Sequence, residues 1–317
     1  MHPAAYRPSV LITGVGGFIG GFLACELSQR GYRVSGTVRD LKTVRAEVVS
    51  ACEKLNSVVI NGSTSWSSLL SSSQSVIHCA AHVHVRRPSR LDQRLFREVN
   101  VDGARALAEG CRDSGAPLLV NLSSIAAETQ TGDEKSSGYG ASKREAERAI
   151  AHVLAGSAAR HVNLRLPAVY GPEGKGALGF LFRWVRSGLP IPVMSMSAKR
   201  SYLSVWNLAD CVAHCLEHPV STPITVAIAD ERPLDLSELL SAMASAASVK
   251  LRFLDIGAVG SAIAAFAVGR RREFRRGMVE TMIDPSVAAR ELGWFPPVSA
   301  SEGWRRVADF YATRGRS

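Results

Sequence analysis

The chain has 317 residues, of which 46% are hydrophobic and 21% are charged. This balance is ordinary for a globular protein with a large core, and it excludes a disordered or fibrous chain. The 38 lysines and arginines against 28 acidic residues give a formal charge of +10, which favours an anionic partner: nucleic acid, an anionic membrane or a phosphorylated small molecule.

Strands and helices are predicted to alternate from the N-terminus onward. The first apolar run, residues 10–13, ends in glycines, and the apolar residues after it have helical spacing up to Gly31, where the helix would end. Further strand-like runs follow at residues 32–38, 58–60, 76–80, 118–123, 162–166 and 224–228. Helical patterns separate most of them, notably at residues 95–111 and 143–154. This order predicts an α/β fold, a Rossmann-type doubly wound parallel sheet that binds ligands at the carboxyl ends of its strands.

The alternation ends after residue 170, and the last part of the chain is mostly helical in pattern. We therefore expect a dinucleotide-binding Rossmann domain from residues 1–166 and 201–228. A smaller, mostly helical C-terminal substrate-binding lobe would comprise residues 167–200 and 229–317. Residues 254–269 are apolar but contain an aspartate and are too short to span a membrane, so they are predicted to form an amphipathic helix packed on the domain.

The cysteines and the N-terminus indicate a cellular compartment. Six cysteines occur without a CxxC pair, and several lie in apolar runs, where a reduced thiol behaves as a small hydrophobic side chain. Residues 1–8 carry no apolar signal-peptide core. Together these features predict a cytoplasmic protein without a membrane span.

The first turn carries glycines at the spacing of a phosphate-binding loop. Gly14, Gly17 and Gly20 lie between the first predicted strand and the first predicted helix. Such a turn needs glycine where the chain bends, where the backbone approaches a pyrophosphate and where helix packs on strand, and the helix N-terminus then faces the anion. The sequence therefore predicts a bound dinucleotide, with a glycine-rich turn that holds no ligand as the alternative.

A tyrosine and a lysine lie one helical turn apart, at Tyr139 and Lys143. A free tyrosine titrates at about 10, too high for proton transfer at neutral pH, and a neighbouring ammonium stabilises the phenolate. The strand that ends in Ser123 and Ser124 brings two hydroxyls to the sheet edge where a nicotinamide would lie. Together these residues indicate a proton-transfer site.

Nine short segments match one family pattern. They are TGVGGFIG at 13–20, VIHCAA at 76–81, NVDGA at 100–104, LSS at 122–124, YGASK at 139–143, LRLPAVYGP at 164–172, SGLPIPV at 187–193, RSYLSVWNLAD at 200–210 and ELGW at 291–294. In these segments the chain resembles the extended short-chain dehydrogenase/reductases, in the branch of NAD-dependent epimerase/dehydratases that act on nucleotide sugars. The resemblance covers nearly the whole chain.

The resemblance implies a role for each matching residue. Tyr139 would be the general acid or base, and Lys143 would bind the nicotinamide ribose and lower the pKa of the tyrosine. Ser124, rather than Ser123, would orient the reacting carbonyl, and Asn100 would support the lysine from the fourth helix. The implied cofactor contacts are Gly14, Gly17, Phe18, Ile19, Gly20, Ala80, Ala81, Lys143, Pro167 and Val169. The implied substrate contacts are Ser124, Arg200, Arg271 and Arg275, and His84 is a further candidate outside the resemblance.

Arg271 and Arg275 belong to a cluster of five arginines at residues 270–276. Guanidinium groups are suited to binding phosphate oxygens. A solvated basic face is the alternative for this cluster. Three histidines, His78, His82 and His84, lie close together without a carboxylate at ligand spacing, so no metal is predicted.

Three features depart from the family pattern. Members that bind NAD end the second strand with an acidic residue on the adenine ribose, whereas this chain has Val38 followed by Arg39. An arginine suits a 2′-phosphate, so NADP(H) is favoured over NAD(H). The interval from Ser124 to Tyr139 is 15 residues, shorter than usual in the family, and Ser63 replaces a frequent acidic contact to adenine.

The leading hypothesis is an NADP(H)-dependent reductase of the C4 ketone of a UDP-4-keto-6-deoxy-N-acetylhexosamine, in surface polysaccharide (O-antigen) synthesis. The alternatives are a UDP-hexose or N-acetylhexosamine 4-epimerase, a dihydroflavonol- or hydroxysteroid-type ketone reductase, and a non-catalytic dinucleotide sensor. No nucleic-acid-binding module supports a nucleic-acid partner. The family also implies a homodimer, formed through the helices predicted at residues 95–111 and 143–154.

Overall fold

The computed structural model describes residues 8–71, 74–83, 89–128, 134–174, 176–193, 198–218, 220, 222–255 and 281–314. It divides the chain into two compact units. The first contains residues 1–166, 209–227 and 290–294, and the second contains residues 167–208, 228–289 and 295–317. The predicted division differs from this one at residues 201–208, 228 and 290–294. The roles assigned to the two units stay a prediction.

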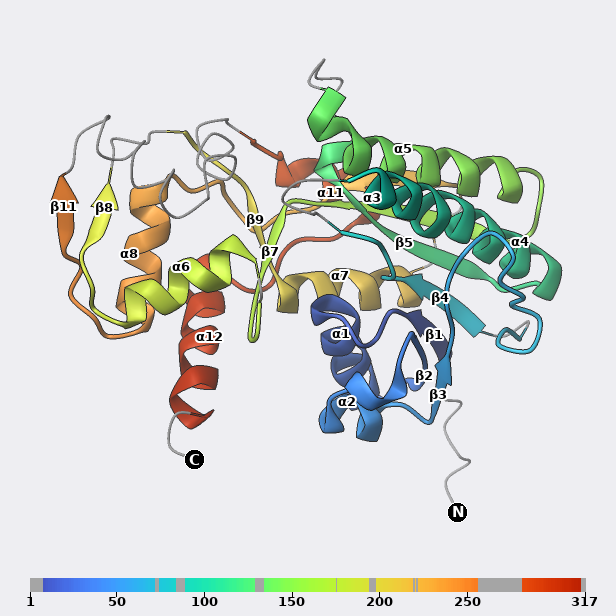
Figure 1. Cartoon of the computed structure of the whole chain (residues 1–317), viewed down its shortest axis with the longest axis horizontal. Helices are drawn as coiled ribbons and strands as arrows, with labels where there is room; N and C mark the ends of the chain where they lie inside the picture. Colours follow the sequence, from blue (N-terminus) through green and yellow to red (C-terminus); the bar gives the residue numbers. More distant parts are fainter. Residues whose placement is uncertain are drawn as a thin grey trace. The chain divides into compact units, whose positions relative to one another are not determined.

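A seven-stranded sheet, parallel at every pairing, forms the centre of the first unit (Figure 1). Its strand order is β10-β6-β5-β4-β1-β2-β3. The strands are β1 (Ser9–Thr13), β2 (Arg33–Val38), β3 (Lys54–Ser57), β4 (Gln74–His78), β5 (Leu118–Ser124), β6 (Arg160–Leu166) and β10 (Ile224–Ala227). The order reverses between β1 and β4, the point where ligands of such sheets bind, and it confirms the predicted Rossmann-type fold.

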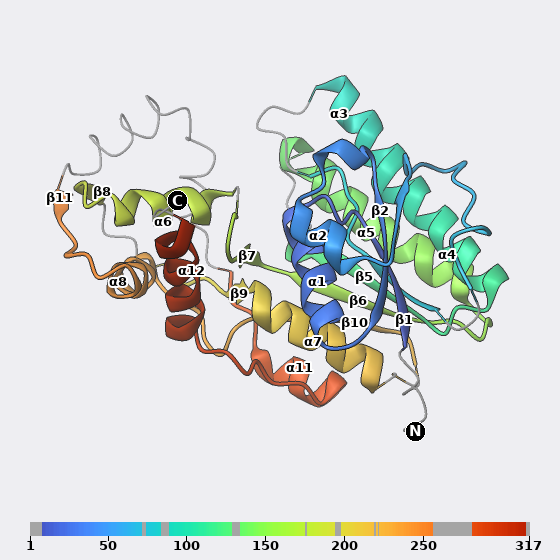
Figure 2. The same cartoon turned by 90° about the horizontal axis from the view of Figure 1, so that it is seen from below.

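Helices cover both faces of this sheet (Figure 2). On one face, α4 and α5 bury their apolar side chains in a single cluster with those of β1, β4 and β5, and α1 and α2 lie on the other face. The helical segments are α1 (Phe18–Gln29), η1 (Leu41–Thr43), α2 (Ala46–Ala51), α3 (Arg90–Leu95), η2 (Phe96–Asp102), α4 (Gly103–Ser114), η3 (Ile125–Ala127) and α5 (Glu134–Leu154). Two more helices, α7 (Val205–Glu217) and α11 (Pro285–Leu292), have residues in both units.

The periodicity of α4 shows why these segments become helices. Ala104, Leu107 and Cys111 recur at helical spacing and are buried, whereas Arg105 between them is exposed. The helix ends at Gly115, whose positive φ of 68° closes the last turn.

Two predicted elements differ from the structure. The predicted strand at residues 58–60 is wrong, because the third strand is β3, Lys54–Ser57. Ile60 is buried in the cluster beneath α4, and Val59 is 67% exposed, so this apolar run reflects packing under a helix rather than a strand. The predicted helix at residues 95–111 is interrupted, because η2 is a π-helical segment between α3 and α4.

Two other boundaries also moved. The helix predicted to start at residue 143 already begins at Glu134. Of the helix predicted at residues 254–269, the first two residues belong to strand β11 (Phe253–Asp255), and the rest lies outside the described residues.

The second unit packs helices around two short strand pairs. β7 (Ala168–Tyr170) pairs with β9 (Tyr202–Ser204), and β8 (Ile191–Val193) pairs with β11. Its helices are α6 (Ala177–Arg186), α8 (Leu236–Ala246) and α12 (Ala300–Arg314). In the core, the rings of Tyr170 and Trp304 stack with centroids 4.2 Å apart.

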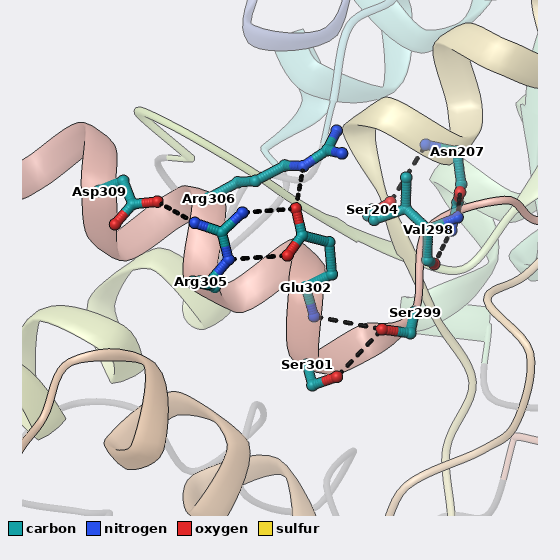
Figure 3. A network of polar contacts seen from close by, with 9 residues as sticks. All are labelled: Ser204, Asn207, Val298, Ser299, Ser301, Glu302, Arg305, Arg306 and Asp309. Atoms are coloured by element: carbon teal, nitrogen blue, oxygen red, sulfur yellow. Dashed lines mark hydrogen bonds and ion pairs between the residues drawn. The ribbon is translucent and has the colours of Figure 1, made fainter.

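A buried polar network ties the strands of this unit together. The Asp230 carboxylate, 3% exposed, accepts hydrogen bonds from the Tyr170 hydroxyl (2.9 Å), the Ser204 amide (2.9 Å) and the Asn207 side-chain amide (2.7 Å). Burial raises the pKa of Asp230 to about 6 despite these donors. Asn207 also exchanges hydrogen bonds with the backbone of Val298, just before α12 (Figure 3). Within the described parts of the chain, no helix has both the length and the hydropathy that crossing a membrane requires.

Candidate active site

The glycine turn after β1 is built for close backbone approach. Gly14 has a positive φ of 76°, and a Cβ at this position would lie 2.9 Å from the Cα of Ala80. A Cβ on Gly20 would lie 2.4 Å from the carbonyl oxygen of Gly14. The amides of Gly14 and Val15 both donate to the carbonyl of Thr37, which fixes the turn against the end of β2. Glycine is therefore required by the geometry at two of the three predicted positions.

The N-terminus of α1 is open to an anion. Its N-cap is Gly17, no side chain caps it, and its first turn contains no acidic residue. Phe18 and Ile19, in that first turn, are half-buried. Unpaired amides at the positive end of a helix dipole suit the pyrophosphate of a dinucleotide, so these residues fit the predicted cofactor.

The ends of β1 and β4 are joined beside this turn. The Thr13 hydroxyl lies 2.8 Å from Nδ1 of His78 and accepts a hydrogen bond from the amide of Ala80 (3.2 Å). Burial lowers the pKa of His78 to about 3, so its imidazole is neutral at physiological pH. His78 thus has a structural role in fixing the strand that carries Ala80 and Ala81.

Ser124 and Tyr139 meet at the carboxyl edge of the sheet. Ser124 is the last residue of β5, and its hydroxyl accepts a hydrogen bond from the Ala126 amide (3.2 Å). Tyr139 lies on α5, and burial raises its pKa to about 12, opposed by a side-chain hydrogen bond with Ser124. A lowered pKa was expected, and the structure has the opposite shift because the ring is desolvated.

Lys143 lies one turn further along α5 and is 5% exposed. Its ammonium donates to the carbonyl oxygen of Leu122 on β5 (2.8 Å). Burial lowers the pKa of Lys143 to about 8, and Cys79 and Glu147 oppose that shift. An ammonium has three donors, so two N–H groups remain for other partners.

Asn100 lies in the π-helical segment η2. Its Oδ1 accepts from the His82 amide (2.7 Å), and its Nδ2 donates to the His82 carbonyl (3.0 Å) and to the Ser142 hydroxyl (3.0 Å). The Ser142 hydroxyl donates in turn to the carbonyl of Tyr139 (2.8 Å). Asn100 therefore joins the chain after β4 to the turn of α5 that carries the tyrosine.

The end of β2 carries no carboxylate. Val38 is 7% exposed, and a Cβ on Gly16 would lie 2.8 Å from its side chain, so the valine packs against the glycine turn. Arg39 follows it and is exposed. The Arg39 cation therefore follows directly after Val38, the position where NAD-binding members of the family have an acidic residue.

The roles of the remaining predicted residues stay predictions. Pro167, Val169 and Arg200 belong to the second unit. His84, Arg271 and Arg275 lie outside the described residues. His82 pairs with Asp92 (3.0 Å), and among the residues described no group of three metal-binding side chains comes together.

Sequence reasoning missed two residues near Tyr139 and Lys143. Phe96 meets the Tyr139 ring edge-on with centroids 6.1 Å apart, and it has no polar group to mark it. Glu147 is buried one turn beyond Lys143 and bonds to Ser123 and Arg165. Its spacing of four residues from Lys143, as Lys143 is four from Tyr139, is the sequence signal that could have found it.

Comparisons with known proteins find relatives in sequence and in structure. The sequence pattern described as NAD dependent epimerase/dehydratase family matches residues 10–229. A UDP-glucose 4-epimerase of Vibrio cholerae is 28% identical over 96% of this chain and 95% of its own. A ceramide reductase of Caulobacter vibrioides is 27% identical over 98% of this chain and 96% of its own. The solved structure of UDP-glucuronic acid 4-epimerase from Bacillus cereus, in complex with UDP-glucuronic acid and NAD, superposes with a TM-score of 0.76 at 19% identity, covering 96% of this chain and 99% of that one.

Proposed function

Because the chain belongs to the NAD-dependent epimerase/dehydratase family, and is thus an extended short-chain dehydrogenase-type enzyme, we propose that it is an NADP(H)-dependent ketone reductase. Its proposed substrate is the C4 ketone of a UDP-linked 4-keto-6-deoxy-N-acetylhexosamine in surface polysaccharide synthesis. The observation that carries the proposal is the hydrogen-bonded pair of Ser124 and Tyr139 at the carboxyl edge of the sheet. The relatives that act on UDP-sugars support the substrate class.

The protein's own residues orient the ketone and supply its proton. The Ser124 and Tyr139 hydroxyls would both donate to the ketone oxygen, which polarises the carbonyl and stabilises negative charge as it develops there. The nicotinamide cofactor, when bound, supplies the hydride. Tyr139 would then give its proton to the alkoxide oxygen. Tyr139 holds that proton at neutral pH, since burial raises its pKa to about 12, and the neutral phenol is the form that can donate.

Lys143 and the glycine turn would hold the cofactor. Lys143 keeps two N–H donors beyond its bond to Leu122, and these would bind the hydroxyls of the nicotinamide ribose. The uncapped N-terminus of α1 would bind the pyrophosphate. Lys143, a cation one helical turn away, would also stabilise the Tyr139 phenolate after proton transfer.

Arg39 supports NADP(H) over NAD(H). It is exposed beside the buried, uncharged Val38, so a 2′-phosphate would gain a charge-assisted contact, and the last residue of β2 offers no carboxylate to a ribose hydroxyl. A reductase consumes NADPH at each turnover, whereas an epimerase regenerates its cofactor. The proposal therefore includes a cytoplasmic location, where NADPH is regenerated.

A UDP-hexose 4-epimerase is the second candidate, because the Vibrio relative carries that name. A ketone reductase with another substrate is the third, because a relative of nearly equal identity is named a ceramide reductase. Both share the Ser124 and Tyr139 chemistry, and they differ from the first in substrate and in net use of the cofactor.

The test is the stoichiometry of cofactor use. Purified enzyme is incubated with NADPH and a UDP-4-keto-6-deoxy-N-acetylhexosamine, with UDP-hexoses and no added cofactor, or with NADPH and a lipid ketone. NADPH loss that matches formation of the reduced UDP-sugar is the expected result. Interconversion of C4 epimers without added cofactor would replace the reductase by the epimerase, and oxidation of NADPH by the lipid ketone alone would replace the sugar substrate.

A further inference from the structure

One side of α5 carries three ionisable residues in a row. Tyr139, Lys143 and Glu147 are spaced by four residues, so they lie on the same face of the helix, toward β5. The first two belong to the proposed active site. Glu147 is 6% exposed, and nothing in the proposed reaction uses it.

Both carboxylate oxygens of Glu147 are held by neighbouring strands. The Ser123 hydroxyl and Nε of Arg165 donate to Oε1, the latter at 3.0 Å, and Nη2 of Arg165 donates to Oε2 at 2.7 Å. Ser123 and Arg165 are register partners on β5 and β6. Ser123 thereby points its hydroxyl at the glutamate, which leaves Ser124 as the serine that meets Tyr139.

A buried ion pair contributes little net stability to a folded protein. The cost of desolvating both charges offsets their attraction, and well-packed hydrophobic residues in their place are often neutral or stabilising. The position of this pair, one turn from a buried ammonium, points to a second effect, since the negative charge of Glu147 favours the charged form of Lys143.

The other charged and titratable groups near Lys143 come from several elements. His78, at the end of β4, is buried and neutral, and Cys79 follows it with a thiol whose pKa burial raises to about 12. Tyr139 is protonated at neutral pH. Arg165 is the second cation, and its Nη1 also pairs with the exposed Glu128 (3.1 Å). Among these groups Glu147 is the buried anion at neutral pH.

We propose that Glu147 is a positioning residue, whose carboxylate, fixed by Ser123 and Arg165, keeps the buried Lys143 ammonium charged and seated on the Leu122 carbonyl. This inference rests on the proposed function in one respect, which is that Lys143 binds the cofactor. The charge coupling itself exists without cofactor or substrate, so it is tested in their absence.

The experiment is a pH titration of lysine ε-carbons by NMR. The chain has only seven lysines, and a Lys143→Gln variant identifies the Lys143 resonance by its loss. Glu147→Gln removes the negative charge while keeping the shape and an acceptor for Ser123. Arg165→Gln breaks the same ion pair from the other side but leaves the glutamate charged. Glu128→Gln, which removes the exposed partner of the same guanidinium, is the matched control.

The two changes have opposite expected effects. In Glu147→Gln the titration midpoint of Lys143 falls by about one pH unit or more, because the ammonium loses the negative charge one helical turn away. In Arg165→Gln the midpoint rises, because the glutamate is no longer neutralised, and in Glu128→Gln it stays at the wild-type value. Midpoints that fall in both ion-pair variants, or that change in neither, would show that the pair is merely structural and would overturn the proposal.

Two readouts keep the result decisive. If Glu147→Gln does not fold, Arg165→Gln carries the test alone, and an unchanged or lower midpoint overturns the proposal. In active protein, the alkaline limb of the kcat profile moves to lower pH in Glu147→Gln and stays in place in Glu128→Gln. If the enzyme does not reduce the UDP-sugar in the stoichiometry test, the proposed function is wrong, but the NMR titration is unaffected because it uses no substrate. The two failures are therefore distinguishable.

Discussion

Replacing Asp230 by asparagine should remove one component of the pH dependence of stability. The folded state holds the Asp230 proton more tightly than the unfolded state, because burial raises the pKa of this carboxyl from 3.8 to about 6. As the pH falls from above 6 to below 4, the folded state takes up a proton that the unfolded state binds only later. The folded state is therefore stabilised in that window, by about 3 kcal/mol for a shift of this size.

Asparagine is the suitable perturbation because the hydrogen bonds allow it. One carboxylate oxygen accepts from Ser204 and Asn207, and the amide oxygen can do the same. The other faces the hydroxyl of Tyr170, which can accept from an amide nitrogen. The variant thus keeps the shape and the bonding capacity of the site but loses the titration.

The assay is urea unfolding between pH 4 and pH 7, followed by tryptophan fluorescence. Three of the five tryptophans, Trp184, Trp206 and Trp304, belong to the second unit that contains Asp230. On acidification the wild type should gain up to about 3 kcal/mol relative to Asp230→Asn. Asp309→Asn, at an exposed site on the same unit, is the control and should run parallel to the wild type. Parallel profiles for wild type and Asp230→Asn would refute the reasoning, because all other carboxyls are common to both.

The remaining predictions concern the active site and assembly. Tyr139→Phe should abolish turnover while calorimetry still detects dinucleotide binding, and full activity would rule out its role as the acid. Ser124→Ala should lower kcat by about 10²-fold, the scale for losing one carbonyl-polarising donor, and an unchanged kcat would contradict it. Arg39→Ala should narrow the difference between NADPH and NADH affinity by about 1.5–3 kcal/mol in fluorescence titrations, and an unaltered ratio would argue against a 2′-phosphate contact. Light scattering at micromolar concentration should give the mass of a homodimer, and the mass of one chain would exclude it.

The sheet and its glycine turn were predictable because they depend on local signals. Buried parallel strands read as apolar runs, and the glycines at 14 and 20 mark places where a Cβ would collide with backbone. The third strand was not predictable in the same way. β3 is an edge strand with one neighbour, so its residues need not be apolar, and the apolar run after it serves the core beneath α4.

The candidate site was only partly predictable for a related reason. Tyr139 and Lys143 are recognisable by spacing, but the direction of the Tyr139 pKa depends on burial, which no spacing reveals. Ser123 bonds to Glu147, which Arg165 also holds, and this contact separates its role from that of Ser124. Glu147 lies on α5 and Arg165 on β6, both distant from Ser123 in the sequence. Contacts between distant segments of this kind become visible only in three dimensions.

The π-helical segment η2 makes the active site sensitive to chain length. A π turn accommodates one residue more than an α turn, so η2 stores extra chain inside an otherwise continuous helix. Deleting a single residue from Phe96–Asp102 would let the segment rewind as α-helix and would change the directions of the side chains inside it. Asn100 would then turn away from the backbone of His82. A deletion in this segment would therefore break the hydrogen bonds that join the chain after β4 to α5 even with Asn100 retained. Related proteins could lose this connection in one step by a change of length, without a substitution at Asn100.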